Sequence, residues 1–224
     1  MRQEIEATAV PPRRKEMRRL AAAARQLIER LVATSAPIEV LAESADDRER
    51  AALRFEGHAQ GHLYEGFAES ANAGGDPRAF FDHSPLLGLA NPLAPPIDVA
   101  MLDRRVEGRV VFGSAYEGPP GCVHGGFIAA AFDEVLGSAQ SLSGSPGMTG
   151  TLTVRYRSPT PLHTELRFEG ELDRVDGRKI FTVGRLFAGD RLCAEAEAVF
   201  ISIDLAKFER LRLDREARAA GRSP

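Results

Sequence analysis

The sequence contains no tryptophan, two cysteines and no apolar run long enough to cross a bilayer. Cys122 and Cys193 stand in no CxxC or zinc-ligand spacing, so we expect neither a disulfide framework nor a structural zinc site. The net charge of −3 excludes the overall basic field with which proteins attract nucleic acid. Residues 1–10 contain acids and lack the apolar segment of a secretory signal. We therefore expect a globular cytoplasmic protein that binds neither nucleic acid nor a membrane.

Two compositional regimes follow one another along the chain. Residues 1–97 have helical and irregular patterns, whereas residues 98–204 alternate as strands do, with one helix among them. Residues 205–224 form a charged tail. The prolines within residues 91–96 predict a rigid extended connector between the regimes. These patterns predict an N-terminal helical extension followed by one α+β domain.

Two helices are predicted in the extension. Apolar residues recur at three- and four-residue spacing over residues 13–32, which is typical of an amphipathic helix. Ser44 and Asp47 have the spacing of an N-cap and of an acidic residue three positions later. A second helix is therefore predicted from Ser44 towards Phe55.

The second regime is predicted to form an antiparallel sheet around one buried helix. The segment 125–141 is apolar on nearly every side, which favours a buried helix. Val199, Ile201 and Ile203 keep a period of two, so we expect them on the covered face of the sheet. Asp-Gly at 176–177 and Gly-Asp at 189–190 indicate hairpin turns. The strands are predicted at residues 99–103, 106–114, 149–157, 164–175, 179–188 and 192–203.

The most informative stretch covers residues 118–128, GPPGCVHGGFI. Its prolines and glycines prevent a helix before His124, and an apolar helix begins directly afterwards. Backbone N–H groups at a helix start stabilise a developing oxyanion, and glycine lets a substrate carbonyl approach them closely. Asp133 lies further along the same helix, where a carboxylate can act on water. We therefore expect the N–H of Gly125 or Gly126 to bind the oxyanion, and Asp133 to act as general base or nucleophile.

The alternative is that Asp133 and Glu134 are two ordinary acids on a helix surface. Neighbouring helix positions point about 100° apart, so the two acids cannot share one task. Gly125 and Asp133 are about 12 Å apart along a helix that rises 1.5 Å per residue. Both groups must lie within roughly 3 Å of one reacting centre. One straight helix cannot provide this, so we predict a composite site between two subunits, with two sites in a dimer.

A family resemblance rests on residues 116–126 (YEGPPGCVHGG) and on Asp133, nine residues after His124. This pattern resembles the PaaI-type acyl-CoA thioesterases of the hotdog fold. Within them it is similar to the branch of the mammalian thioesterase superfamily members of the carboxyl-terminal-modulator type. Similar segments in that branch are TGTLTV passing into YRSP (149–159 here) and the turn VDGRK (175–179 here). The resemblance covers roughly residues 84–204, and residues 1–80 carry no motif that we assign.

The resemblance implies an acyl-CoA thioesterase with the hotdog fold, a long buried helix wrapped by an antiparallel sheet, without cofactor or metal. It also implies a homodimer or a dimer of dimers, with the active site at the subunit interface. Thr149 then lies near the nucleophilic water, or else is an ordinary strand residue. His124 either orients the loop or assists the leaving sulfur, or else only packs in the loop. A non-catalytic acyl-CoA-binding regulatory module on the same fold is the alternative function.

Coenzyme A carries phosphates, so a basic turn is expected near the mouth of the site. Arg178 and Lys179 follow the turn at 176–177 and are the first candidates, with Arg155 and Arg157 as alternatives. Arginine suits bidentate phosphate contacts better than lysine does. The competing interpretation is that these side chains only solubilise the ends of strands.

Overall fold

The computed structural model describes residues 10–58 and 81–202, and the chain divides into two compact units between Ala94 and Pro95. This boundary lies inside the proline-rich stretch that the sequence indicates as a connector. The predicted tail at 205–224 lies outside the described residues. In the part of the chain that the structure describes, no helix is long and apolar enough to cross a membrane.

The N-terminal unit contains two helices, α1 (Pro12–Val32) and α2 (Ile38–Leu53). The first confirms the helix predicted over residues 13–32. The predicted start of the second helix at Ser44 is wrong, because α2 begins directly after Pro37 and Ser44 lies inside it. Pro37 has extended φ and ψ of −66° and 161°. The glutamate, leucine and alanine residues that follow it are good helix formers, so the helix starts as soon as the proline permits.

A buried carboxylate ties the last part of this unit to α1. Asp82 is 4% exposed, and its oxygens pair with Arg14 Nε at 3.0 Å and with Arg18 Nη2 at 2.8 Å. Arg25, two turns further along the helix, donates to the Asn91 carbonyl at 2.8 Å. A buried carboxylate without such partners is costly. The arginines of α1 therefore fix the segment that leads to the second unit.

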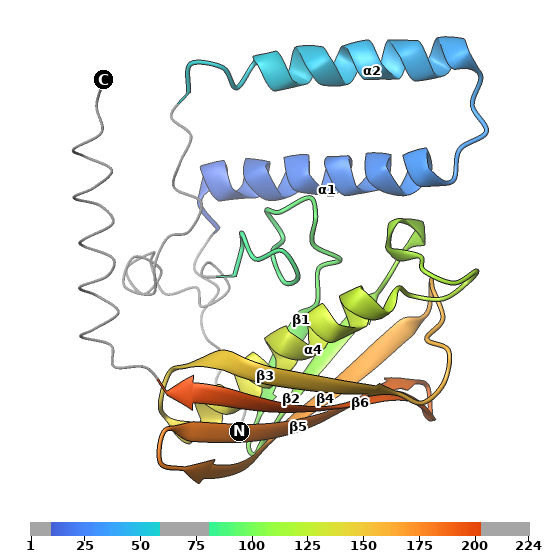
Figure 1. Cartoon of the computed structure of the whole chain (residues 1–224). Coiled ribbons are helices and arrows are strands. Elements are labelled where there is room, and N and C mark those ends of the chain that lie inside the picture. Colours follow the sequence, from blue (N-terminus) through green and yellow to red (C-terminus); the bar gives the residue numbers. More distant parts are fainter. Residues whose placement is uncertain (1–9, 59–80, 203–224) are drawn as a thin grey trace. The chain divides into compact units, whose positions relative to one another are not determined.

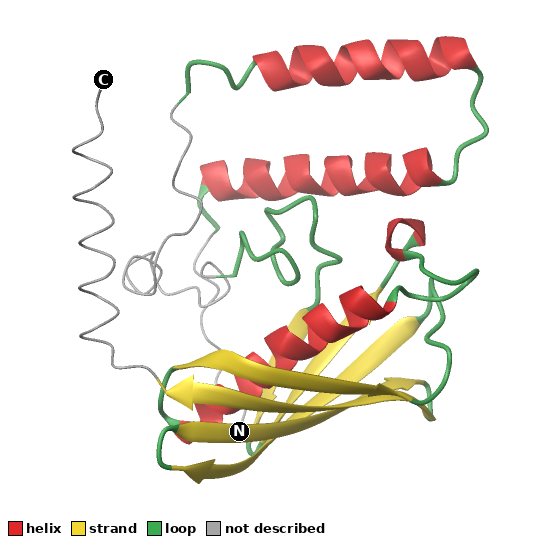
Figure 2. Cartoon of the chain, viewed as in Figure 1, coloured by secondary structure: helices red, strands yellow, loops and turns green. Residues whose placement is uncertain are grey.

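In the second unit, the described strands form one antiparallel six-stranded sheet in the order β1-β2-β4-β5-β6-β3 (Figures 1 and 2). Gly177 and Gly189 have positive φ angles of 56° and 59°, which confirms both predicted hairpin turns. The strands are β1 (Asp98–Leu102), β2 (Arg105–Val111), β3 (Gly147–Tyr156), β4 (Glu165–Asp176), β5 (Lys179–Ala188) and β6 (Arg191–Ser202).

One long helix, α4 (Gly125–Gln140), lies across one face of this sheet (Figure 1). This confirms the predicted α+β hotdog arrangement, in which an antiparallel sheet wraps a central helix. The largest buried side chains of α4 face the sheet. The ring of Phe132 packs edge to face against that of Phe168 on β4, with centroids 5.0 Å apart. The buried apolar residues of α4 are Ile128, Ala131, Phe132, Val135, Leu136 and Ala139.

A small-residue row, Gly170, Gly184 and Ala196, crosses the sheet beneath α4. These residues pair in register on β4, β5 and β6. A Cβ at Gly184 would lie 3.0 Å from Leu136 Cδ2, and a Cβ at Gly170 would lie 3.1 Å from Val135 Cγ1. Both distances are shorter than a relaxed carbon–carbon contact. The two glycines therefore allow α4 to lie close to the sheet.

The face predicted for β6 is wrong by one residue. Val199 and Ile201 are half-buried and point away from α4, and Ile203 lies outside the described residues. Because the helix lies so close, the covered face has room mainly for alanine. The buried residues of β6 on that face are Ala194, Ala196, Ala198 and Phe200.

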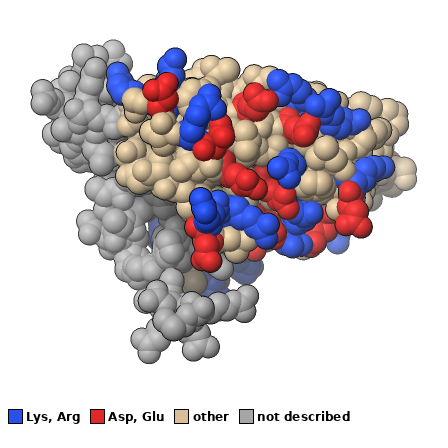
Figure 3. Space-filling model, turned by 90° about the horizontal axis from the view of Figure 1, so that it is seen from below, with Lys and Arg blue, Asp and Glu red and all other residues tan. Residues whose placement is uncertain are grey.

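The opposite face of the sheet carries arginine and glutamate side chains in alternation (Figure 3). Arg155 pairs with Glu197 at 2.6 Å, and Arg157 pairs with Glu195 at 2.7 Å. These four side chains are part of the lining of a shallow hollow of about 430 Å³. Exposed ion pairs of this kind add little stability, and they offer no surface to an apolar acyl chain. We therefore expect the reacting groups on the helix side of the sheet.

Candidate active site

The loop before α4 holds the helix start in one position. The Gly121 N–H donates to Glu117 Oε1 at 2.6 Å, and the His124 N–H donates to the Tyr116 carbonyl at 2.8 Å. A Cβ at Gly118 would lie 2.7 Å from His124 Cα, so only glycine fits there. These contacts fix the direction in which the chain enters the helix.

His124 is the N-cap of α4. The Gly126 N–H donates to His124 Nδ1 at 3.0 Å. In a neutral imidazole the accepting nitrogen carries no hydrogen, so the ring hydrogen lies on Nε2. The sequence left a packing role and a chemical role open for His124. The structure gives it a capping role and leaves the Nε2–H of this exposed ring as a second donor.

The N–H of Gly125 differs from that of Gly126. The Gly126 N–H is bonded to His124, whereas no described residue accepts a hydrogen bond from the Gly125 N–H. The first N–H groups of a helix have no partner within the helix. Of the two N–H groups expected to bind substrate, that of Gly125 is therefore the available one, and that of Gly126 serves the cap.

Tyr156 adjoins this helix start, and the sequence assigned it no role in the site. Its hydroxyl donates to the Gly125 carbonyl at 2.8 Å. A Cβ at Gly125 would lie 3.1 Å from Tyr156 Oη and 3.2 Å from its Cζ. Glycine at 125 therefore makes room for this phenol ring. No local pattern reveals the contact, because it joins residues 31 positions apart through the packing of β3 on α4.

Asp133 lies half-buried in the third turn of α4, beside the other end of β3. Thr149 Oγ1 donates to Asp133 Oδ1 at 2.8 Å, and no described residue donates to Oδ2. The pairing of β3 with β6 shifts between Thr149 and Thr151, and such a bulge re-aims the side chains beside it. The threonine orients the carboxylate and leaves one oxygen available to accept a proton.

Replacing Thr149 by valine is expected to lower kcat by roughly 10- to 100-fold, because a hydrogen bond to a charged group contributes about 1.5–3 kcal/mol. The measurement is the steady-state rate of the thioester hydrolysis that the sequence resemblance implies. Thr151→Val is the matched control, since Thr151 lies beyond the bulge on the same strand and its hydroxyl has no hydrogen bond to another described residue. Equal rates for both variants would contradict a role for Thr149.

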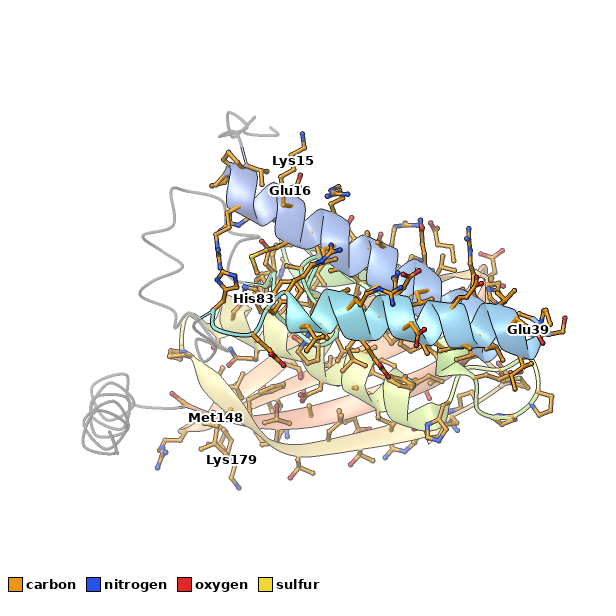
Figure 4. All side chains as sticks on the ribbon, turned by 90° about the horizontal axis from the view of Figure 1, so that it is seen from above. Lys15, Glu16, Glu39, His83, Met148 and Lys179 are labelled. Atoms are coloured by element: carbon orange, nitrogen blue, oxygen red, sulfur yellow. The ribbon has the colours of Figure 1, made fainter. Side chains whose placement is uncertain are left out.

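The basic residues predicted to contact phosphate lie at opposite ends of β3. Lys179 and Met148 both pair in register with Ile201, so the turn with Arg178 and Lys179 lies beside the start of β3 (Figure 4). Arg157 directly follows the other end of β3. One chain therefore does not bring Arg157 together with Arg178 and Lys179.

The site residues of one chain thus form two groups. The glycine end consists of His124, Gly125 and Tyr156, and the carboxylate end consists of Asp133 and Thr149. The helix α4 is uninterrupted between them, so about 12 Å of helix axis separates the N–H of Gly125 from Asp133. Among the described residues, no three His, Cys, Asp or Glu side chains cluster closely enough to hold a metal ion.

Residues 120–195 match the thioesterase superfamily. A solved thioesterase superfamily protein is 37% identical, and the match covers 83% of this chain and 94% of that chain with a TM-score of 0.71. The second unit alone is shorter than the matched part, so the likeness extends into the N-terminal unit.

Curated relatives match over a shorter part. The acyl-coenzyme A thioesterase THEM4 of Xenopus laevis is 37% identical over 93 residues, which is 41% of this chain and 42% of that protein. THEM4 of Mus musculus is 34% identical over 116 residues, which is 49% of this chain and 50% of that protein. The chain therefore matches these relatives over half of their length or less.

Proposed function

Because this chain belongs to the thioesterase superfamily, we propose that it hydrolyses an acyl-CoA thioester to a carboxylic acid and coenzyme A. Relatives named acyl-coenzyme A thioesterases in Xenopus laevis and Mus musculus support this substrate class.

The observation that carries the proposal is the hydrogen bond from Thr149 to Asp133. The free carboxylate oxygen takes a proton from a water molecule, the water oxygen bonds to the carbonyl carbon, and the C–S bond breaks. The proton then leaves on the sulfur of coenzyme A. In the nucleophilic variant, the carboxylate oxygen itself bonds to the carbon, the thiolate leaves, and water cleaves the resulting anhydride. Both routes need an oriented carboxylate, and the hydrogen bond from Thr149 orients that of Asp133.

The Gly125 N–H is the donor for the oxyanion that forms on the thioester oxygen. It lies at the first residue of α4, where the aligned peptide dipoles favour negative charge. A donor of this kind contributes about 3 kcal/mol to lowering the barrier. The Nε2–H of His124, the N-cap residue, is a second donor for the same oxygen or for the departing sulfur.

The complete site is composite in this proposal, because the glycine end and the carboxylate end of one helix cannot reach one thioester. The glycine end of one subunit meets the carboxylate end of its partner in a homodimer, within either a dimer or a dimer of dimers. Arg178 and Lys179 then lie on the subunit that supplies Asp133. Arg157 is less suited to bind phosphate, because its guanidinium is paired with Glu195 at 2.7 Å, whereas that of Arg178 donates to the neutral Ser202 carbonyl at 3.2 Å.

A panel of acyl-CoA thioesters tests the proposal directly. We expect release of free thiol for at least one acyl-chain class, with a rate that is first order in enzyme. A thiol-reactive dye measures the release, and the same substrates in buffer alone give the background. Tight binding of acyl-CoA without thiol release would instead indicate a binding module.

A further inference from the structure

The peptide group between Gly125 and Gly126 is bonded at both of its polar atoms. Its carbonyl oxygen accepts from Tyr156 Oη at 2.8 Å, and its N–H donates to His124 Nδ1 at 3.0 Å. A peptide group is planar, so fixing its two polar atoms fixes the orientation of the whole group. Glycine on both sides would otherwise leave that orientation free.

The peptide group between His124 and Gly125 is held by hydrogen bonds from the first turn of α4. The His124 carbonyl accepts from the N–H groups of Phe127 and Ile128 at 3.0 and 3.3 Å. In a trans peptide the N–H points opposite to the carbonyl, so the Gly125 N–H is directed out of the helix start. Tyr156 closes the other side of Gly125, with its Oη 3.1 Å from where a Cβ would lie. Gly125 therefore lies between two peptide groups whose orientations are both fixed by hydrogen bonds.

The hydrogen bonds also run in one direction. The Tyr156 hydroxyl donates to a carbonyl, the attached N–H donates to His124 Nδ1, and the ring hydrogen is left on Nε2. Each bond in such a chain polarises the next and strengthens it. Tyr156 thereby acts on both donors of the glycine end, although its hydroxyl is bonded to the main chain rather than free for a substrate.

We propose that Tyr156 is a positioning residue that orients the Gly125 N–H and the Nε2–H of His124 through the Gly125–Gly126 peptide. The mechanistic part of this inference rests on the proposed thioesterase function. The structural part, that Tyr156 holds the peptide, can be measured without any substrate.

The test compares the wild-type protein with Tyr156→Phe, which removes a single oxygen from a side chain that is 55% exposed. Loss of one hydrogen bond is expected to lower kcat by about two- to tenfold with KM unchanged. Amide hydrogen exchange followed by NMR is expected to speed up at Gly126 by a similar factor, since the cap loses its polarised, oriented donor. Thr153→Val removes a hydroxyl from the same strand and is expected to change neither quantity.

Unchanged exchange at Gly126 overturns the proposal, whatever happens to kcat. A raised KM with unchanged kcat also overturns it, because Tyr156 would then be a substrate contact. Absence of thiol release in the wild-type protein would sink the proposed function and leave the exchange result standing. If Tyr156→Phe destabilises β3, Gly125→Ala is used in its place for the exchange measurement. The added Cβ would lie 3.1 Å from Tyr156 Oη and would push against the same phenol.

Discussion

Replacing Asp133 by asparagine is expected to lower kcat by about 10²- to 10⁴-fold, the usual contribution of a general base. Asparagine keeps the volume of the side chain and an oxygen that accepts from Thr149, so the packing of α4 is preserved. The amide cannot take a proton from water or attack the thioester. The measurement is thiol release under saturating substrate, with circular dichroism to verify the fold.

Glu134→Gln is the matched control for this variant. Glu134 is the next residue of α4 and is also half-buried, but it points about 100° away around the helix axis. We expect it to retain the wild-type rate within a few-fold. A rate for Asp133→Asn close to that of the wild-type protein would remove Asp133 from the mechanism.

A heterodimer of one Asp133→Asn subunit and one Gly125→Pro subunit is expected to recover about half of the wild-type rate, because the proposed dimer then keeps one of its two interface sites intact. Each parent homodimer lacks one group at both sites, and loss of the Gly125 donor costs about 10²- to 10³-fold. Differently tagged subunits, purified through both tags, give the heterodimer whose thiol release is measured.

Proline is a suitable way to delete the N–H at this position. Gly125 is the first helical residue, where proline is tolerated, and His124 has φ and ψ of −61° and 132°, as a residue before proline prefers. Proline also adds a Cβ that crowds Tyr156, so Gly125→Ala, which adds the same Cβ and keeps the N–H, separates the effect of this crowding from the loss of the N–H. A heterodimer no faster than the mean of its parents would place the whole site within one chain.

Local signals in the sequence were sufficient to predict most helices and strands of the second unit. The alternation and turn residues predicted β4, β5 and β6 to within one residue at each end, and the apolar segment predicted α4. The start of α2 was missed because a serine with an acid three residues later resembles a cap even inside a helix. Proline at position 37 was the stronger signal, since it cannot donate a hydrogen bond to an earlier carbonyl.

Contacts between distant segments decided what the sequence missed. The covered face of β6 depends on how closely α4 approaches, and glycines on two other strands set that distance. The motif indicated His124, Gly125 and Gly126 without showing that one of the two N–H groups is used by the cap. Tyr156 belongs to the strand that also holds Thr149, and only the packing of that strand on α4 reveals that it touches both ends of the site.

The small-residue row beneath α4 has a consequence for how this protein can change. The helix that rests on Gly170 and Gly184 carries both the proposed oxyanion donor, Gly125, and the proposed base, Asp133. An added methyl group at either glycine would lift both reacting groups together, and in a symmetric dimer it would do so from both sides of each site. If the proposed site is correct, Gly170 and Gly184, on the sheet beneath the helix, thus limit how its two halves can be rearranged.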